Sequence, residues 1–431
     1  MPVPRSAPAH PHPGNPHPGM GFREFVAFIA GLMATNAIAI DSMLPALPEI
    51  GKSLGMDSAN RAQLVITAYL LGFGGAQLFY GTLADRFGRR NVLLFGLAVY
   101  TAASIGAVFA GTLEVMLAAR VVQGIGSAAT RILAITIVRD CYSGARMARV
   151  MSLAFLVFLS VPILAPSIGQ AIILVAPWRG IFLMLCLFGA VLFTWTLARL
   201  PETLHAQDRS PISFSGMAQA FGLIVRSRVT IGYTLATTMA MGGLFGFINS
   251  AQQVFADAFH AQGLFTLIFA LIAVFMMASS LLNARIVEKL GMRRVSHVAL
   301  FGYLGVTFTH GVIVLAGVET IWTFSILQGV MMFCFGLMVS NFNSMAMEPV
   351  GHVAGTASSV LGFASTVGGA LIGFTLGQHF DGTTRPLTLG FATLAVAALG
   401  CVLFAERGRL LGRDRPPAGG GLHSTQPPPS A

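Results

Sequence analysis

The chain has 431 residues, of which 55% are hydrophobic and only 10% are charged, and its mean hydropathy is +0.75. Soluble domains carry about 25% charged residues, so this composition excludes a soluble enzyme, a disordered protein and a secreted disulfide-bonded scaffold. The net charge of +10 does not indicate a nucleic-acid partner, because excess Lys and Arg in a membrane protein mark its cytoplasmic side.

Twelve apolar stretches are each long enough for a membrane-spanning helix of about 20 residues. In chain order they cover 23–45, 62–84, 91–110, 113–138, 148–175, 178–199, 228–255, 262–284, 295–316, 320–343, 353–377 and 387–405. A backbone in hydrocarbon must satisfy its hydrogen bonds within its own segment, which favours helices. The sequence therefore predicts an all-α membrane protein with the lipid bilayer as its surroundings.

The longest polar stretch between these spans divides them into two groups of six. We expect a disordered tail rich in Pro, Gly and His, two six-helix bundles joined by a linker, and a second disordered tail. The first tail is 1–20 and the second is 407–431. The bundles are 21–200 and 228–406, and the linker between them is 201–227.

The distribution of Lys and Arg predicts the orientation. The chain has 26 Lys and Arg, of which 20 lie in the tails and loops on one side of the spans. The opposite side has only Lys52, Arg61, Arg179 and Arg385, and two Arg lie within the spans. This imbalance places both termini in the cytoplasm. Arg greatly outnumbers Lys, which suggests a bacterial source and hence the inner membrane.

An internal repeat relates the two bundles. The loop after the second span reads GTLADRFGRR and the loop after the eighth reads ARIVEKLGMRR, so that Asp85 matches Glu288 and Gly88 matches Gly291 at an offset of 203 residues. Duplicated helical halves suit a transporter, in which one bundle rocks against the other.

The loop after the second span, G-x-x-x-D-R-x-G-R-R, resembles the signature loop of the major facilitator superfamily of secondary transporters. It contains Gly81, Asp85, Arg86, Gly88, Arg89 and Arg90. The resemblance implies a gating role, in which Asp85 pairs with a cation or with the positive end of a facing helix. The alternative is a solvated basic loop that only fixes topology.

The fourth span carries Arg120, Gln123, Ser127 and Arg131 at helical spacing, so these side chains share one face. Charges within a membrane span usually face a cavity. The segment resembles the RxxQGxG motif of proton-coupled members of the superfamily, which implies that Arg120 and Gln123 influence protonation of an acidic partner. A structural ion pair or a polar helix contact is the alternative, and for Arg131 the two interpretations are evenly balanced.

Asp41 is the candidate partner, because it is the only carboxylate well inside a predicted span and lies at about the depth of Arg120. Burial favours its neutral form and Arg120 favours its ionised form, so that it could bind and release a proton. The surrounding AxDxxLP is similar to a helix signature of twelve-span drug:proton antiporters. A structural role at the helix end before Pro45 stays open.

The fifth span contains VPILAPSIGQ, which resembles the GxxxGPxxGG motif of antiporters in an Ala-Pro form typical of the Bcr/CflA drug exporters. Pro162, Pro166 and Gly169 would kink this helix and let a neighbour approach closely. Val161, Ala165 and Gln170 depart from the motif, and any proline-kinked helix would share part of it.

The second bundle has no counterpart of the charged pair and instead carries aromatic, Met and amide side chains, which suit varied apolar ligands. Together with Arg131, the candidate substrate-cavity residues are Phe247, Asn249, Gln252, Phe335 and Asn341. Each of these would also serve in ordinary packing. We expect His310 to be a hydrogen-bonded packing residue rather than a proton relay.

No phosphate-binding loop, enzyme site or metal-ligand spacing is found, so we expect a transporter that needs no cofactor or metal and is driven by a proton gradient. The residues and resemblances together favour a monomer that exports drug-like or amphipathic small molecules in exchange for protons. The alternatives are a carrier of one metabolite on the same fold and a non-transporting membrane sensor or chaperone.

Overall fold

The computed structural model describes residues 20–204, 207, 209 and 221–412. Within these residues the regular secondary structure is entirely helical, and twelve segments are long and apolar enough to cross a membrane. This confirms the predicted fold class. The predicted tails, apart from residues 20 and 407–412, and much of the predicted linker lie outside the described residues.

The helices follow the predicted spans to within a few residues at most ends. They are α1 (Phe22–Asp41), α2 (Leu47–Ser53), α3 (Leu64–Phe87), α4 (Arg89–Val108), α5 (Leu113–Cys141), α6 (Gly144–Val175), α7 (Arg179–Arg199), α9 (Arg228–Gln253), α10 (Phe265–Leu290), α11 (Met292–Leu315), α12 (Ile321–Met347), α13 (Ala354–Gln378) and α14 (Arg385–Glu406). The first membrane-crossing segment is longer than predicted, because a 3-10 turn and α2, each with a Pro in its first turn, continue it beyond Asp41 to Ser53.

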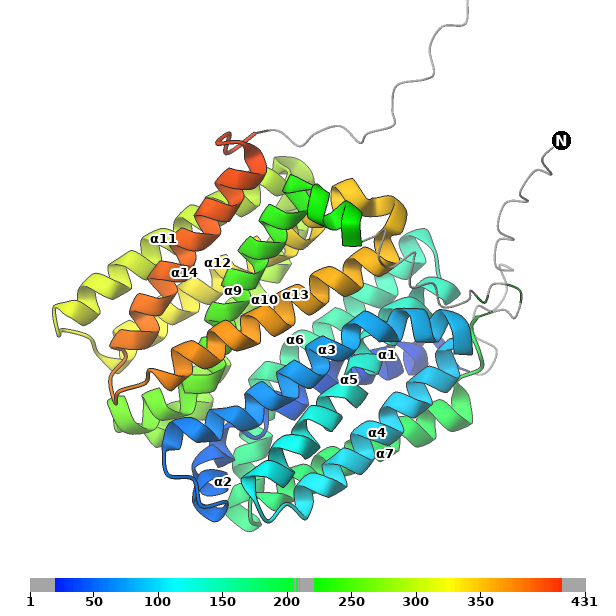
Figure 1. Ribbon diagram of the computed structural model, residues 1–431, viewed down its shortest axis with the longest axis horizontal. Coiled ribbons are helices and arrows are strands. Elements are labelled where there is room, and N and C mark those ends of the chain that lie inside the picture. Colours follow the sequence, from blue (N-terminus) through cyan, green and yellow to red (C-terminus); the bar gives the residue numbers. More distant parts are fainter. Residues whose placement is uncertain (1–19, 205–206, 208, 210–220, 413–431) are drawn as a thin grey trace, which may run out of the picture.

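The helices form two groups that lie side by side (Figure 1). The first group comprises α1 to α7, and the second comprises α9 to α14. The main packing between the groups is that of α3 against α13 and of α6 against α10. We call the end at which α1 begins and α14 ends the terminal end; the far end carries α2, at the lower left of Figure 1.

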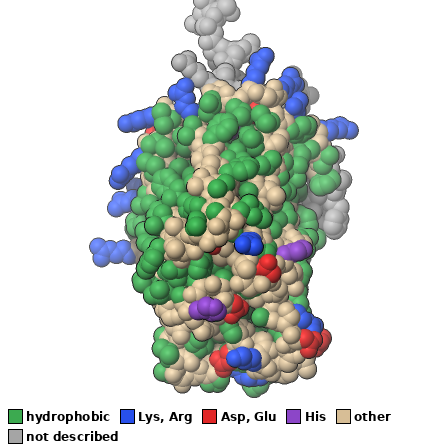
Figure 2. Space-filling model, turned by 90° about the vertical axis from the view of Figure 1, so that its left-hand side faces the viewer, with side chains coloured by type: hydrophobic (Ala, Val, Ile, Leu, Met, Phe, Trp, Pro, Cys, Tyr) green, Lys and Arg blue, Asp and Glu red, His purple; other side chains and the backbone are tan. Residues whose placement is uncertain are grey.

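The outer face of the molecule is suited to lipid. Large apolar side chains on peripheral helices are exposed, among them Phe95, Leu187, Leu267 and Val312. Figure 2 shows hydrophobic side chains in a broad band across one face, with Lys and Arg projecting above it and along its upper flanks. This distribution matches a protein whose middle lies in hydrocarbon.

Inside the first group, glycines bring α5 against its neighbours. A Cβ on Gly124 would lie 2.1 Å from the carbonyl oxygen of Tyr69 in α3, and one on Gly126 would lie 2.5 Å from the backbone nitrogen of Tyr100 in α4. Small residues allow membrane helices to approach this closely. The two glycines of the QGxG sequence therefore position the face of α5 that carries Arg120.

Candidate functional site

Arg120 is fully buried where α1, α3 and α5 meet. Its guanidinium donates hydrogen bonds to the backbone carbonyls of Val65 in α3 (3.0 Å) and Ala39 in α1 (3.2 Å), and to the side-chain oxygen of Gln123 (2.5 Å). It also lies 4.4 Å from the centre of the Tyr69 ring. Backbone carbonyls and an aromatic face thus surround the charge.

Gln123 extends this polar contact to α4. Its side-chain nitrogen donates to the Ser104 hydroxyl (2.7 Å), which in turn donates to the carbonyl of Tyr100 (2.8 Å). Beside this chain, the Tyr69 hydroxyl donates to Ser127 (2.7 Å). Arg120, Gln123 and Ser127 of the predicted polar face of α5 therefore take part in buried hydrogen bonds within the first group of helices, whereas Arg131, the fourth residue of that face, is exposed.

Asp41 is the last residue of α1 and is 4% exposed. Within the part of the chain that the structure describes, no hydrogen bond or ion pair joins its carboxylate to Arg120. The two residues are instead related through the chain, because Arg120 binds the carbonyl of Ala39, two residues before Asp41. Arg120 thus stabilises the end of α1 from which the Asp41 side chain extends.

The Pro-containing helix α6 packs directly on this end of α1. The helix runs without a break through Pro162 and Pro166. A Cβ on Gly169 would lie 1.7 Å from the carbonyl oxygen of Ser42, the residue after Asp41. The absence of a side chain at Gly169 is therefore what lets α6 approach the Asp41 turn.

Arg89 is the centre of the loop between α3 and α4. Its guanidinium bonds the carboxylate of Asp85 (2.6 Å) and that of Asp140 at the end of α5 (3.0 Å). Arg90 donates to the carbonyl of Leu197 in α7 (2.8 Å), whereas Arg86 is exposed. The loop thus ties together the terminal ends of α3, α4, α5 and α7.

Two glycines of the loop are needed for different reasons, Gly88 for its backbone conformation and Gly81 for its closeness to the other group of helices. Gly88 has φ +94° and ψ 153°, a conformation almost confined to glycine, and it separates α3 from α4. Gly81 faces α13 of the other group, because a Cβ there would lie 3.5 Å from the Ser359 hydroxyl. The loop therefore begins at the interface between the two groups of helices.

Glu202 completes this cluster, and sequence reasoning missed it. Its carboxylate accepts hydrogen bonds from the backbone N–H groups of Arg89 (2.7 Å) and Arg90 (3.3 Å), at the N-terminus of α4. Thr203 and Leu204 also donate their backbone N–H groups to it (both 3.1 Å). The preference of helix N-termini for acidic groups was a usable signal, but nothing paired residue 202 with residue 89.

The second group contains a matching cluster around Arg293. Its guanidinium bonds the carboxylates of Glu406 (2.9 Å) and Glu348 (3.0 Å), and the Tyr233 hydroxyl also donates to Glu406 (2.8 Å). Gly291, with φ +84° and ψ 149°, has nearly the backbone conformation of Gly88. Each half therefore has an Arg near the start of its third spanning helix that pairs with an acidic residue at the end of its fourth, Asp140 in the last turn of α5 and Glu348 directly after α12.

The candidate cavity residues do not form one group. Phe247 stacks on Phe269 (5.7 Å between ring centres), and Asn341 donates to Asn283 (2.8 Å), so these pairs join helices within the second half. Arg131 is exposed and lies 6.0 Å from the centre of the Phe73 ring.

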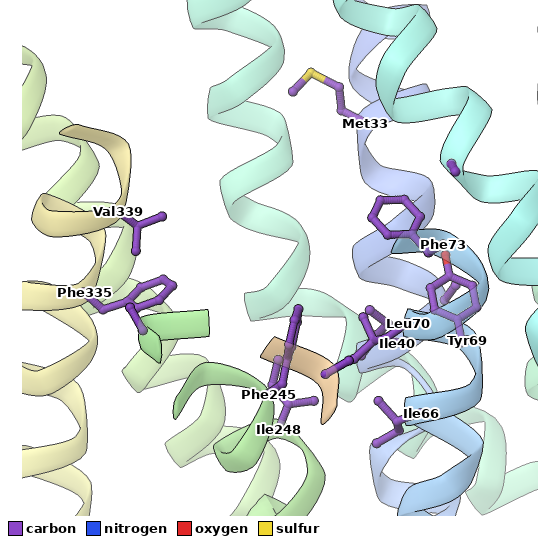
Figure 3. Packing of buried hydrophobic residues seen from close by; sticks show 14 of the residues in the cluster. Met33, Ile40, Ile66, Tyr69, Leu70, Phe73, Phe245, Ile248, Phe335 and Val339 are labelled. Atoms are coloured by element: carbon purple, nitrogen blue, oxygen red, sulfur yellow. The ribbon is translucent and has the colours of Figure 1, made fainter. Parts of the chain in front are cut away.

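The apolar contact between the halves is formed partly by other residues. Figure 3 shows Phe245 and Ile248 of α9 opposite Ile40 of α1 and Leu70 of α3, with Phe335 of α12 nearby. Ile40 immediately precedes Asp41. Sequence reasoning missed Ile248 and Leu70, because apolar residues in spans look alike whether they face lipid, core or the other half.

At the far end, four side-chain amides join the halves in what we call the amide network: Asn60, Gln63, Gln253 and Gln378. Gln63 donates to Gln253 (2.5 Å), and Gln253 donates to Asn60 (2.7 Å). Asn60 donates to the carbonyl of Gln378 (3.1 Å), whose side chain donates to the carbonyl of Asn60 (2.7 Å). By contrast, none of the ion pairs found between described residues joins the two halves.

His310 lies in α11, fully buried, with its ring nitrogen 2.6 Å from the carboxylate of Glu319. Glu319 also accepts from the hydroxyl of Thr384, just before α14. These contacts join elements of the second half only. Among the described residues, no group of three or more His, Cys, Asp or Glu side chains is placed to hold a metal ion.

Comparison with known proteins identifies the family. The profile of the Major Facilitator Superfamily matches residues 25–373. The chain is 28% identical over 389 residues to the bicyclomycin resistance protein homolog of Haemophilus influenzae, covering 89% of this chain and 96% of that protein. It is 30% identical over 379 residues to a chloramphenicol resistance protein of Pseudomonas aeruginosa, covering 84% and 86% of the two chains.

The fold has solved counterparts. The crystal structure of a D-xylose-proton symporter superposes with a TM-score of 0.70 at 14% sequence identity, covering 88% of this chain and 97% of that one. At this identity the likeness concerns the fold alone. The profile match covers most of the chain and agrees with the resemblance to the Bcr/CflA proteins seen in the sequence, so the chain belongs to the Major Facilitator Superfamily and is a membrane transporter.

Proposed function

We propose that this protein exports drug-like small molecules in exchange for protons by alternating access. Asp41 carries the proposal. It is buried within a membrane-crossing segment, and no described residue provides it with an ion pair or hydrogen bond. An unpaired charge at such a depth is costly, and binding a proton removes it. The names of the bicyclomycin and chloramphenicol resistance relatives support a drug-like cargo.

Arg120 is proposed to change the proton affinity of Asp41 through its distance from that carboxylate, and not as a permanent counter-ion. Its hydrogen bond to the Ala39 carbonyl ties it to the end of α1. Gly169 brings α6 onto the Ser42 carbonyl at the same place. Movement of α1 or α6 would change the distance between Asp41 and Arg120, and with it the affinity of Asp41 for a proton.

The two bundles, 21–200 and 228–406, are proposed to rock about the interfaces of α3 with α13 and α6 with α10. In the conformation described, the amide network holds the far end together. Release of this network would open the far end, and the loop of residues 81–90 would then hold the terminal end through Asp85 and its neighbours.

We also infer the surroundings of the protein. The imbalance of Lys and Arg supports cytoplasmic termini at the terminal end and an export direction toward the far end. A bacterial inner membrane, a monomeric state and a linker over 201–227 complete this proposal. The required partners are lipid, the exported solute and protons.

Transport by purified protein in lipid vesicles tests the proposal. An imposed pH gradient should drive chloramphenicol uptake into vesicles in the wild type and in Asp381→Asn, which changes an exposed loop carboxylate. The Asp41→Asn variant should fold normally but lose this response. Gradient-driven uptake that persists in Asp41→Asn would rule out the role of Asp41. Absence of gradient-driven chloramphenicol uptake in the wild type would contradict the proposed export of this kind of cargo.

A further inference from the structure

A cavity of about 380 Å³ lies at the far end, between the segment that includes α2 and the C-terminal part of α9. Its volume is within the range of about 300–1,000 Å³ that small-molecule sites occupy. The first half contributes Gln63 and Lys52, and the second contributes Asn249, Gln252 and Gln253. The cavity is thus lined by both halves and lies next to the amide network.

Asn249 is the distinctive side chain of this cavity. It is 1% exposed, and neither its side-chain oxygen nor its side-chain nitrogen has a hydrogen-bond partner among the described residues. A buried polar group without a partner destabilises a protein by about 1–3 kcal/mol and calls for an explanation. A ligand that displaced the side chains covering this amide from the cavity would supply both a donor and an acceptor to it.

The charges of the lining indicate what kind of ligand fits. The buried part of the lining is neutral, with the amides of Asn249, Gln252 and Gln63, whereas Lys52 and Asp257 are exposed and opposite in sign. A charged ligand would lose water without gaining an opposite charge in the buried part. An uncharged solute with amide or hydroxyl groups would satisfy the side-chain amides.

The cavity and the amide network share two residues. Gln63 and Gln253 line the cavity and also bond each other across the two halves (2.5 Å). A solute that hydrogen-bonds either side chain would compete with that bond. Occupation of the cavity would therefore weaken the contact that keeps the far end closed.

We propose that this cavity is a binding subsite for an uncharged solute with amide or hydroxyl groups, anchored by Asn249, near the exit of the transport pathway. The inference rests on the proposed function in one respect, since it takes the cargo to be a small molecule that leaves at the far end. It deepens that proposal by naming a substrate class.

Equilibrium binding to the purified protein in lipid nanodiscs tests the subsite. The probes are radiolabelled chloramphenicol, which is uncharged and has an amide and hydroxyls, and tetraphenylphosphonium, a cation. Asn249→Leu should weaken chloramphenicol binding about tenfold, the effect of losing two hydrogen bonds. It should leave tetraphenylphosphonium binding unchanged. Ser250→Ala is the matched control, because Ser250 is equally buried and unpartnered but does not line the cavity.

The thermal midpoint keeps this test independent of folding. Asn249→Leu removes an unpartnered buried amide, so its Tm should equal or exceed that of the wild type. Equal chloramphenicol affinity of wild type and Asn249→Leu, or no chloramphenicol binding by the wild type, would overturn the proposal. Equal weakening of tetraphenylphosphonium binding by Asn249→Leu would also overturn it. Because no pH gradient is applied, loss of proton coupling at Asp41 would leave these binding results unaffected.

Discussion

The carboxylate of Glu202 accepts a hydrogen bond from the backbone N–H of Arg89 (2.7 Å), and thereby caps α4 from a position 113 residues along the chain. The side chain of the same Arg89 bonds Asp85 and Asp140. One short segment after α7 is thus attached to the loop whose sequence marks the family. The contact joins the start of the connection between the two halves to the element proposed to gate the terminal end.

Replacement of Glu202 by Ala should loosen the start of α4. Loss of a helix cap costs about 1 kcal/mol, and the amides of Arg89 and Arg90 would become free to exchange. Hydrogen exchange measured by mass spectrometry should rise in a peptide covering 88–92 and stay constant in one covering 291–295. Glu288→Ala is the control, because Glu288 is exposed in the matching loop. Unchanged exchange at 88–92 would contradict the capping role.

Gly88→Ala should destabilise the protein more than Gly144→Ala does. Both glycines have positive φ, but Gly144 (φ +54°) has nothing within 4 Å of an added Cβ. At Gly88 (φ +94°) the added Cβ would lie 2.2 Å from the carboxylate of Glu202. We expect a loss of about 1–2 kcal/mol for Gly144→Ala from backbone strain alone, and a larger loss for Gly88→Ala. Equal Tm values for the two variants would contradict this expectation, because neither the backbone conformation of Gly88 nor the approach of Glu202 would then resist an added Cβ.

Arg120→Lys should behave as a severe change although the charge is kept. The guanidinium bonds Ala39, Val65 and Gln123 at once, and a Lys ammonium lacks this planar arrangement of donors. We expect gradient-driven transport to fall at least about tenfold, while Arg131→Lys, a change at an exposed side chain over Phe73, has less effect.

Arg120→Ala tests the proposed tuning of Asp41 more directly. Removal of the positive charge should change the pH range in which exchange occurs, because the proton affinity of Asp41 depends on the charges near it. The measurement is the rate of solute exchange over a series of pH values. An unaltered pH profile with a reduced rate would assign Arg120 a purely structural role.

The sequence was sufficient for the fold but not for the contacts of the site. Length and apolarity located twelve spans, because a membrane leaves few alternatives to a helix of about 20 residues. The repeat of Gly88 and Gly291 could be recognised in the sequence, because both turns need the same glycine conformation. The hydrogen-bond acceptors of Arg120 could not be predicted, because every residue has a backbone carbonyl and nothing in the sequence distinguishes those of Ala39 and Val65.

The amide network escaped prediction for a similar reason. Asn60 and Gln63 lie just before α3 and Gln378 ends α13, and amide side chains at the ends of membrane helices are common and usually face water. Their pairing depends on how the two halves meet, which no local pattern encodes. Glu202 is a different case, because an acidic residue shortly after a span is a candidate helix cap. Only the helix that it caps, α4, could not be predicted.

The network itself yields the last prediction, that Asn60→Ala favours opening of the far end. Asn60 donates to the carbonyls of Gln378 and Phe380 and accepts from Gln253, so all three bonds cross between the halves. Each hydrogen bond contributes about 0.5–1.5 kcal/mol, so the population open at the far end should rise at least about tenfold. Spin labels at positions 57 and 381, in a background without the native cysteines, would report this as a shift to longer distances. Asn91→Ala, which removes an exposed amide bonded within one half at the terminal end, should leave the distances unchanged. If Asn60→Ala also left them unchanged, the far end would be held closed by the packing of α3 on α13 rather than by the amides.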